Sequence, residues 1–211
     1  LDPFFLSVVS ASEQWFFRSS NGTLSAGRRS PDTALFPYLT VDKILENWNC
    51  TGPLTAIQCE GKLWHPFWPT TAHAEPVKRR LLKSMLGEEL VFDEFHQALG
   101  LRFTYRWQLS DEFGFVRKVK LLNESDEVRS LRLIDGLQDL QPSGVDSSLH
   151  LQLSCLADAY KMSELDCGGA LMIHRLASGI VDAPIALECL KATTVWTAAF
   201  KDGHTFLSRG E

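Results

Sequence analysis

The sequence lacks any apolar run that approaches the roughly 20 residues needed to cross a lipid bilayer. It also lacks the basic start, apolar middle and small-residue cleavage site of a signal peptide. Basic residues are in the minority, with 21 Lys and Arg against 26 Asp and Glu, and the one dense basic cluster lies at residues 78–83. Because proteins that follow nucleic-acid phosphates usually carry a concentrated basic surface, we expect neither a nucleic acid nor a membrane as partner.

The five cysteines lack the spacing of a disulfide framework or a zinc site, and their odd number leaves at least one of them unpaired. Cys59, His65 and His73 carry donor atoms that zinc accepts, but their spacing matches no common zinc site. We therefore expect no metal and no other cofactor. Unpaired cysteines favour the cytoplasm as the compartment.

The sharper catalytic signatures are absent as well. The chain contains no GxSxG elbow, no phosphate-binding loop, no HExxH and no GxGxxG at the start of a helix. Asp93 and Glu94 are neighbours on a predicted strand and so point to opposite faces. Only Glu94 and His96 can therefore share a site for acid–base chemistry.

The strongest pattern that is present is an alternation of apolar and polar residues. Five apolar residues alternate with polar ones from Leu101 to Leu109, residues 110–114 supply turn chemistry, and the alternation resumes from Phe115 to Leu121. This predicts a long antiparallel hairpin, which apolar runs at 81–86, 90–96 and 128–137 extend into a meander of four or five strands. We interpret the Arg and Lys residues on its polar face as solvated sheet surface, with a binding surface as the alternative.

The remaining segments predict further strands and few helices. Strands are expected at 4–10, 14–19, 54–59, 63–67, 171–176, 187–200 and 205–208, and short helices at 40–48 and 147–156. The run at 187–200 is typical of a strand buried on both faces. With 211 residues, of which 45% are hydrophobic, the chain is predicted to form one β-sandwich domain over residues 1–211. The expected class is all-β in the main, with two antiparallel sheets and one or two short helices.

Two regions are candidates for binding. The irregular stretch at 24–48 joins charge and an aromatic ring in Arg28, Arg29, Asp32 and Tyr38, and long loops are often functional. A salt-bridged structural loop is the alternative for this stretch. Six tryptophans are many for this length, and exposed indole rings at Trp64 and Trp68 would suit the apolar face of a sugar. The alternative is that the tryptophans fill the core of a sandwich.

Five stretches along the chain carry a resemblance to a known family. They are FFLSVVSASEQWFFRSSNGTLSAGR, DTALFPYLTVDKI, GLRFTYRWQLSDEFGFVRKVKLLN, LADAYKMSEL and LKATTVW. Together they resemble the amino-terminal, galactose mutarotase-like β-supersandwich domain of glycoside phosphorylases and related hydrolases. The resemblance is to the cellobiose phosphorylase-like group, and is closer to uncharacterised bacterial proteins near that group.

In that family the domain precedes a helical linker and an (α/α)6 barrel, and the barrel carries the catalytic acid. The resemblance thus implies a truncated, non-catalytic amino-terminal part of a larger carbohydrate-active enzyme, inactive as this piece alone. The partners that it implies are a carbohydrate, the carboxy-terminal barrel and a second copy in a homodimer. It places Arg28, or else Arg29, near the sugar subsites, and it also implies the cytoplasm.

Two other functions remain open on the same architecture. A mutarotase-like sugar epimerase would need a carboxylate base and an imidazole acid in one cleft, and its candidates are Glu94, His96, His174 and Glu188. A carbohydrate-binding module would need exposed tryptophan rings at Trp64 and Trp68. The supporting-domain hypothesis instead predicts an exposed apolar patch on one sheet, where the barrel or linker would dock.

Overall fold

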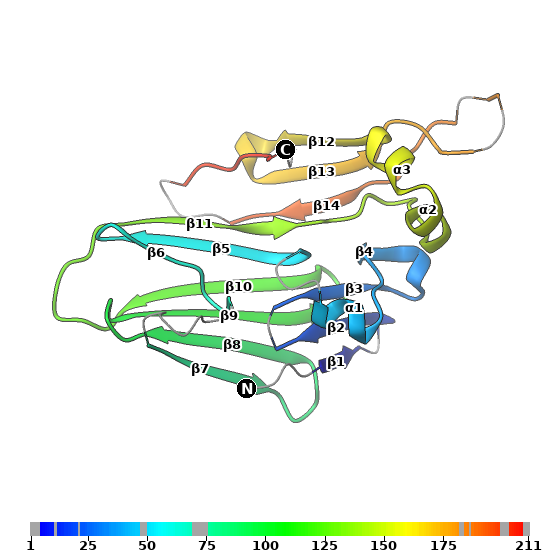
Figure 1. The fold of residues 1–211 in the computed structure, drawn as a ribbon. Helices are drawn as coiled ribbons and strands as arrows, with labels where there is room; N and C mark the ends of the chain where they lie inside the picture. The colour runs from blue at the N-terminus through cyan, green and yellow to red at the C-terminus, as the bar shows by residue number, and fades with distance from the viewer. Residues whose placement is uncertain are drawn as a thin grey trace.

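The computed structural model describes residues 5–10, 12–20, 22–46, 50–68, 76–181, 184–185, 187–198 and 203–208. Strands in antiparallel sheets dominate these residues, and the helices among them are short (Figure 1). The predicted all-β class is confirmed. Within the described residues, no helix has the length and apolar character needed to span a membrane.

The predicted hairpin is the centre of a four-stranded sheet. This sheet comprises β7 (Val77–Lys83), β8 (Glu89–His96), β9 (Leu101–Ser110) and β10 (Gly114–Asn123), in the order β10-β9-β8-β7. Ser110 pairs with Gly114 at the hairpin turn, and alternate residues of β9 from Leu101 to Trp107 are buried. The alternation therefore predicted the hairpin and the dry face of β9 correctly.

A second four-stranded sheet packs on the dry face of the first. It comprises β1 (Phe5–Val9), β2 (Gln14–Ser19), β3 (Leu24–Arg28) and β4 (Ala34–Phe36). The Phe16 ring of β2 lies 5.5 Å from the Trp107 ring of β9, measured between centroids. Part of the stretch at 24–48, which was expected to be irregular, thus forms the strands β3 and β4. A 3-10 helix (Pro31–Thr33) lies between these two strands, and α1 (Val41–Glu46) follows β4.

The expected fifth strand of the meander belongs to a different sheet, which corrects the prediction. β11 (Leu131–Gln138) pairs antiparallel with β5 (Gly52–Cys59), and β5 also pairs with β6 (Lys62–Trp64). The chain leaves β10 through a turn in which the Asn123 amide donates to the backbone oxygen of Glu127, at 2.7 Å. Arg117 of β10 and Asp135 of β11 then join the two sheets by an ion pair of 2.6 Å.

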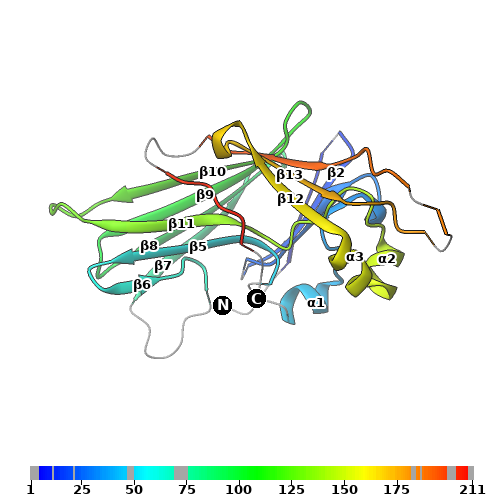
Figure 2. The same cartoon turned by 90° about the horizontal axis from the view of Figure 1, so that it is seen from above.

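These three sheets share one core. A single cluster of buried side chains includes Phe16, Leu24, Ile57, Phe92 and Phe103, which come from all three sheets. Figure 1 shows β11 and β5 above the long strands β8–β10, and in Figure 2, seen from above, the two sheets overlap. The structure thus has a sandwich character, but its strands form four sheets instead of the two expected.

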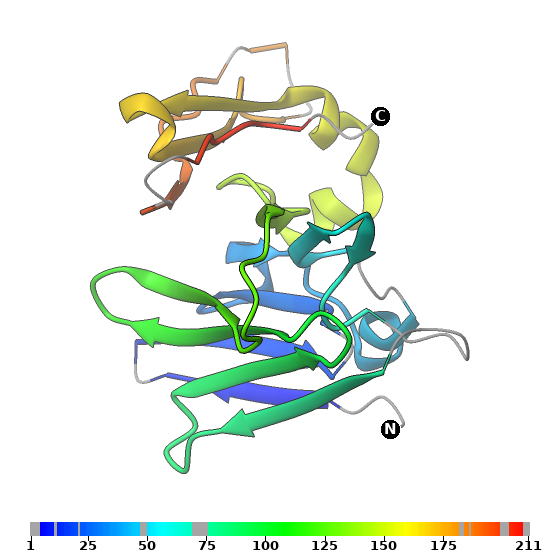
Figure 3. The same cartoon turned by 90° about the vertical axis from the view of Figure 1, so that its left-hand side faces the viewer.

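The fourth sheet forms a separate layer above β11 and β5 (Figures 1 and 3). This C-terminal layer comprises α2 (Ser147–Gln152), α3 (Ser154–Tyr160), β12 (Lys161–Asp166), β13 (Leu171–Leu176) and β14 (Thr193–Trp196). It has its own small cluster of buried side chains, centred on Val145, Ala157 and Leu176.

Several sequence-based predictions for this layer were wrong in detail. The helix expected at 147–156 is two helices, because the backbone breaks at Leu153 with φ −132°, and the second continues to Tyr160. Of the strand expected at 187–200, the described residues 187–198 are regular only at 193–196, where Trp196 lies opposite Leu171, the first residue of the partner β13. Trp196 is 69% exposed, so this strand is not buried on both faces. The expected strand at 205–208 has no regular structure in the four residues.

Candidate functional site

The predicted loop residues lie at the boundary between the sandwich and the C-terminal layer. Asp32, in the 3-10 helix, accepts hydrogen bonds from the backbone nitrogen and the hydroxyl of Ser147, at 3.1 and 2.6 Å. These two bonds lower the pKa of Asp32 below its usual value. Tyr38 is 46% exposed, and one edge of its ring is supported by Trp15, 5.4 Å away between centroids.

A small pocket opens beside Tyr38, and we call it the Tyr38 pocket. It encloses about 40 Å³, room for a few water molecules or one small polar group. Its walls come from the 31–38 segment, from the chain around residue 141 and from α2. The lining residues are Pro31, Ala34, Pro37, Tyr38, Gln141, Val145, Asp146, Ser147, His150 and Leu151.

Gln141 gives this pocket an acceptor atom. Its side chain is buried, its amide nitrogen donates to Asp139 at 3.0 Å, and its oxygen Oε1 has no hydrogen-bond partner. A buried polar atom without a partner is costly, so this amide in the lining makes its side of the pocket a candidate for binding a water or a ligand hydroxyl. Burial lowers the pKa of His150, with a further contribution from Lys161, so its imidazole is neutral at pH 7. The neutral imidazole and the Gln141 amide suit a polar ligand, and Asp146 adds to the lining a carboxylate that accepts from the backbone nitrogen of Leu149 at 2.7 Å.

Arg28 and Arg29 are exposed and do not line the Tyr38 pocket. Arg29 pairs with Glu13 at 2.6 Å, an exposed contact that matches the salt-bridged alternative for this stretch. The role of Arg28 near a sugar stays a prediction.

The two tryptophans proposed as a sugar platform differ in their surroundings. Trp64 is 5% exposed, and its indole nitrogen donates to Glu94 at 2.7 Å, so this ring has no free face for a sugar. The exposure of Trp64 that a carbohydrate-binding module would need is not found. Trp68 is half-buried and stacks on His65, with 4.1 Å between ring centroids. Trp15 and Trp107 are buried, which fits the core alternative, while Trp48 lies outside the described residues.

The candidate residues of an epimerase do not form one cleft. Both oxygens of the buried Glu94 are engaged, by Trp64, by the backbone nitrogen of Phe67 at 2.8 Å and by Arg79 at 2.5 Å. His174 belongs to β13 of the C-terminal layer, where it contacts Leu140 and Ser163.

His96 accepts a bond from the backbone nitrogen of Leu99 at 3.3 Å, and Glu188 lies exposed outside the regular strands. Glu94 and His96 thus form hydrogen bonds within the protein interior at the sheet β7–β10. The geometry gives no support to acid–base catalysis by the four epimerase candidates.

No group of three metal-ligating side chains occurs among the described residues. Cys59 is buried in the core, and the ring of His65 contacts the backbone oxygen of Thr55 at 3.2 Å. His73, the third residue considered as a ligand, lies outside the described part of the chain.

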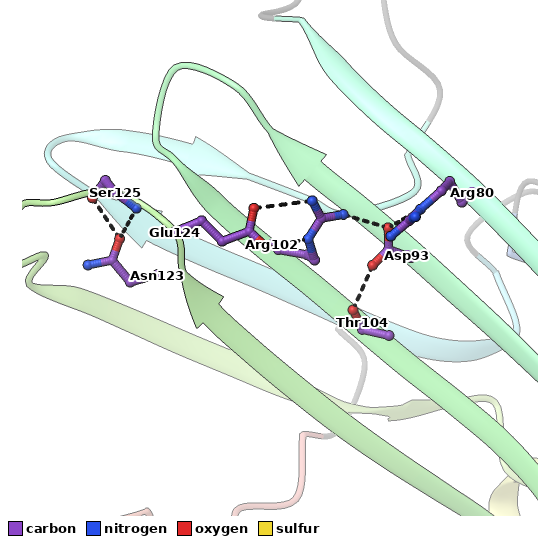
Figure 4. Close-up of polar contacts among 7 residues, drawn as sticks. All are labelled: Arg80, Asp93, Arg102, Thr104, Asn123, Glu124 and Ser125. Atoms are coloured by element: carbon purple, nitrogen blue, oxygen red, sulfur yellow. Dashed lines mark hydrogen bonds and ion pairs between the residues drawn. The ribbon is translucent and has the colours of Figure 1, made fainter.

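The polar face of the sheet β7–β10 carries a network of ion pairs (Figure 4). Asp93 accepts bonds from Arg80 at 3.0 Å, Arg102 at 2.8 Å and Thr104 at 2.9 Å, and Arg102 continues to Glu124 at 2.6 Å. Burial acts to raise the pKa of Asp93, but the hydrogen bonds from Arg80 and Thr104 and the charge of Arg102 lower it overall. These charges neutralise one another, as expected for a solvated sheet face.

No protein-family model matches this chain, and a search of the curated proteins finds no match either. The resemblance to the glycoside phosphorylase domain therefore depends on the five sequence stretches alone.

Proposed function

We propose that this chain is a non-catalytic β-sandwich domain of a carbohydrate-active enzyme of the glycoside phosphorylase or hydrolase type. In this proposal it packs against a helical catalytic barrel through its C-terminal layer, and it presents the stretch that carries Arg28, Asp32 and Tyr38 to the sugar.

The observation that carries this proposal is the exposed apolar surface of the C-terminal layer. Leu190 is 88% exposed, Leu151 is 78% exposed and Trp196 is 69% exposed. Soluble proteins rarely leave many large apolar side chains in water unless another surface covers them. We call these exposed side chains the docking surface; they are Leu151, Leu153, Leu156, Ile185, Leu187, Leu190, Trp196 and Phe206.

Leu151 lines the Tyr38 pocket and is also one of the exposed side chains of the docking surface. A domain docked there would lie next to Tyr38, Gln141 and His150. This arrangement supports a role for the loop at the edge of a shared sugar site, and the resemblance supplies the barrel as the docked domain.

The docking surface can be tested with Leu190→Ser and Trp196→Ser. Both variants should keep the melting temperature of the isolated chain within about 2 °C of wild type, because exposed substitutions change stability little. They should also bind less of a hydrophobic dye. Leu101→Ser, in the buried face of β9, is the matched control and should destabilise the chain strongly. A large loss of stability in the two surface variants would show that the chain itself covers these side chains, and the proposal would fail.

The absence of catalysis is tested separately. The isolated chain should neither accelerate the mutarotation of glucose, followed by optical rotation, nor release glucose 1-phosphate from cellobiose and phosphate. Acceleration that is lost in Glu94→Gln and His96→Asn would contradict the proposal and favour the epimerase.

A further inference from the structure

Arg18 lies in the interior of the sandwich. It shares a face of β2 with Phe16 and is 1% exposed. Its guanidinium lies over the ring of Phe92, 4.2 Å from the centroid, and near that of Tyr105, at 5.1 Å. One of its nitrogens, Nη2, donates to the Tyr105 hydroxyl. Side chains with a charge are almost never fully buried unless an opposite charge pairs with them.

Among the described residues, no carboxylate pairs with Arg18. Its nitrogens Nε and Nη1 are buried without a hydrogen-bond acceptor. After burial and Tyr105, the group that acts on its pKa is another cation, Arg117, which is already held by Asp135 at 2.6 and 2.8 Å. Burial lowers the pKa of Arg18 to about 10, so it is still charged at pH 7. One positive charge in the core is thus left without compensation.

Arg18 forms part of a small pocket, which we call the Arg18 pocket. It encloses about 20 Å³, which is the space of one or two oxygen atoms. Pro53, Pro66, Phe67 and Trp68 provide apolar walls, and Thr55 and Tyr105 provide hydroxyls. Burial raises the pKa of Tyr105 to about 12, so its phenol keeps a proton that it can donate.

A glycine lies beside the guanidinium, next to the nitrogen that donates to Tyr105. Gly22 has φ +105°, a conformation that residues other than glycine rarely adopt. A Cβ at this position would lie 3.3 Å from Nη2 of Arg18.

We propose that the Arg18 pocket binds a carboxylate group of a small organic acid, with one oxygen of the carboxylate against the free N–H groups of Arg18. Arg117 and Arg79 are each neutralised by a carboxylate of the chain, so Arg18 is the one of these three arginines that lacks a negative partner. A ligand with one negative charge would neutralise it. The narrow space admits one oxygen of a flat group. The apolar walls suit the carbon skeleton that carries it. This site is separate from the Tyr38 pocket and does not depend on the proposed function.

Thermal unfolding with acetate as the probe tests this site. At pH 7 and constant ionic strength, replacement of chloride by acetate should raise the melting temperature, by about 3–6 °C at ten times the dissociation constant. Arg18→Met, which has similar length and no charge, should show no acetate-specific rise. Arg29→Met, which removes an exposed arginine, is the matched control and should respond like wild type.

An NMR titration keeps the test valid if Arg18→Met does not fold. The side-chain Nε signal of Arg18 should shift with acetate in a saturable way, and Tyr105→Phe should weaken the response by several-fold. A larger response to glucuronate than to acetate would identify the acid as a sugar acid. An unmoved Arg18 signal, or an equal rise in melting temperature in wild type and Arg18→Met, would overturn the proposal.

Discussion

Replacing Glu94 by glutamine should destabilise the chain by about 3–5 kcal/mol, because this substitution removes one partner of a buried ion pair. Glu94 is completely buried and accepts bonds from Trp64, Phe67 and Arg79, at 2.7, 2.8 and 2.5 Å. Together these bonds fix the segment after β6 against β8. The change from carboxylate to amide alters almost no volume, so the cost reports on charge and hydrogen bonding.

The magnitude follows from the hydrogen bonds. A bond to a charged group contributes about 1.5–3 kcal/mol. Glutamine keeps one acceptor oxygen, and its NH2 group must face at least one of the three former donors. The side chain of Arg79 is 32% exposed, so water compensates part of the hydrogen bond that Arg79 loses. We therefore expect a destabilisation in the lower half of the range of about 3–5 kcal/mol.

The assay is urea unfolding followed by tryptophan fluorescence and circular dichroism. Glu124→Gln is the matched control: its carboxylate is more exposed and pairs with Arg102, and exposed ion pairs contribute little. A loss below about 1 kcal/mol in Glu94→Gln, similar to that of the control, would refute the structural role of Glu94.

Three further predictions follow from single contacts. Asp93→Asn should lower the free energy of unfolding by about 1–2 kcal/mol at pH 7. Because the fold lowers the pKa of Asp93, the difference in stability between wild type and variant is complete above about pH 4 and should disappear as the pH falls through the folded-state pKa. Urea midpoints measured over this pH range test it. Burial lowers the pKa of His174, so wild type should lose stability as the pH falls below about 6.5, and His174→Asn should lose less over the same range in the same assay. Gly27→Ala should cost about 1–3 kcal/mol in thermal melts, since the added Cβ would lie 2.5 Å from the Trp15 ring, 2.7 Å from Cα of Ala34 and 2.8 Å from the backbone oxygen of Thr33; an unchanged melting temperature would show that both the ring and this backbone can move aside.

The hairpin β9–β10 could be predicted from the sequence because all its determinants are local. Alternation fixes which residues are buried, and Gly114, with φ +69°, fixes the turn. The partner of β11 could not be predicted in this way. The alternation of β11 shows that it is a strand. Whether it pairs with β10 or with β5 depends on the turn after Asn123 and on contacts between layers.

The candidate sites show the same limit. Asp32 and Tyr38 could be recognised as candidates from their irregular stretch, but Gln141, Ser147 and His150 come from a distant part of the chain and meet them only through the fold. For Arg18, the signal was its position two residues after Phe16, which places a cation on the buried face of β2.

The pairing of β5 with β11 has a consequence for the way the chain folds. The strands β7 to β10 are consecutive neighbours, so each can pair with the one before it as soon as both are synthesised. The edge of β5 that receives β11 must wait until all of these strands have been made. We therefore expect a late, slow folding step in which β11 closes that edge, and a preceding intermediate that is vulnerable to edge-to-edge aggregation on the ribosome or in refolding.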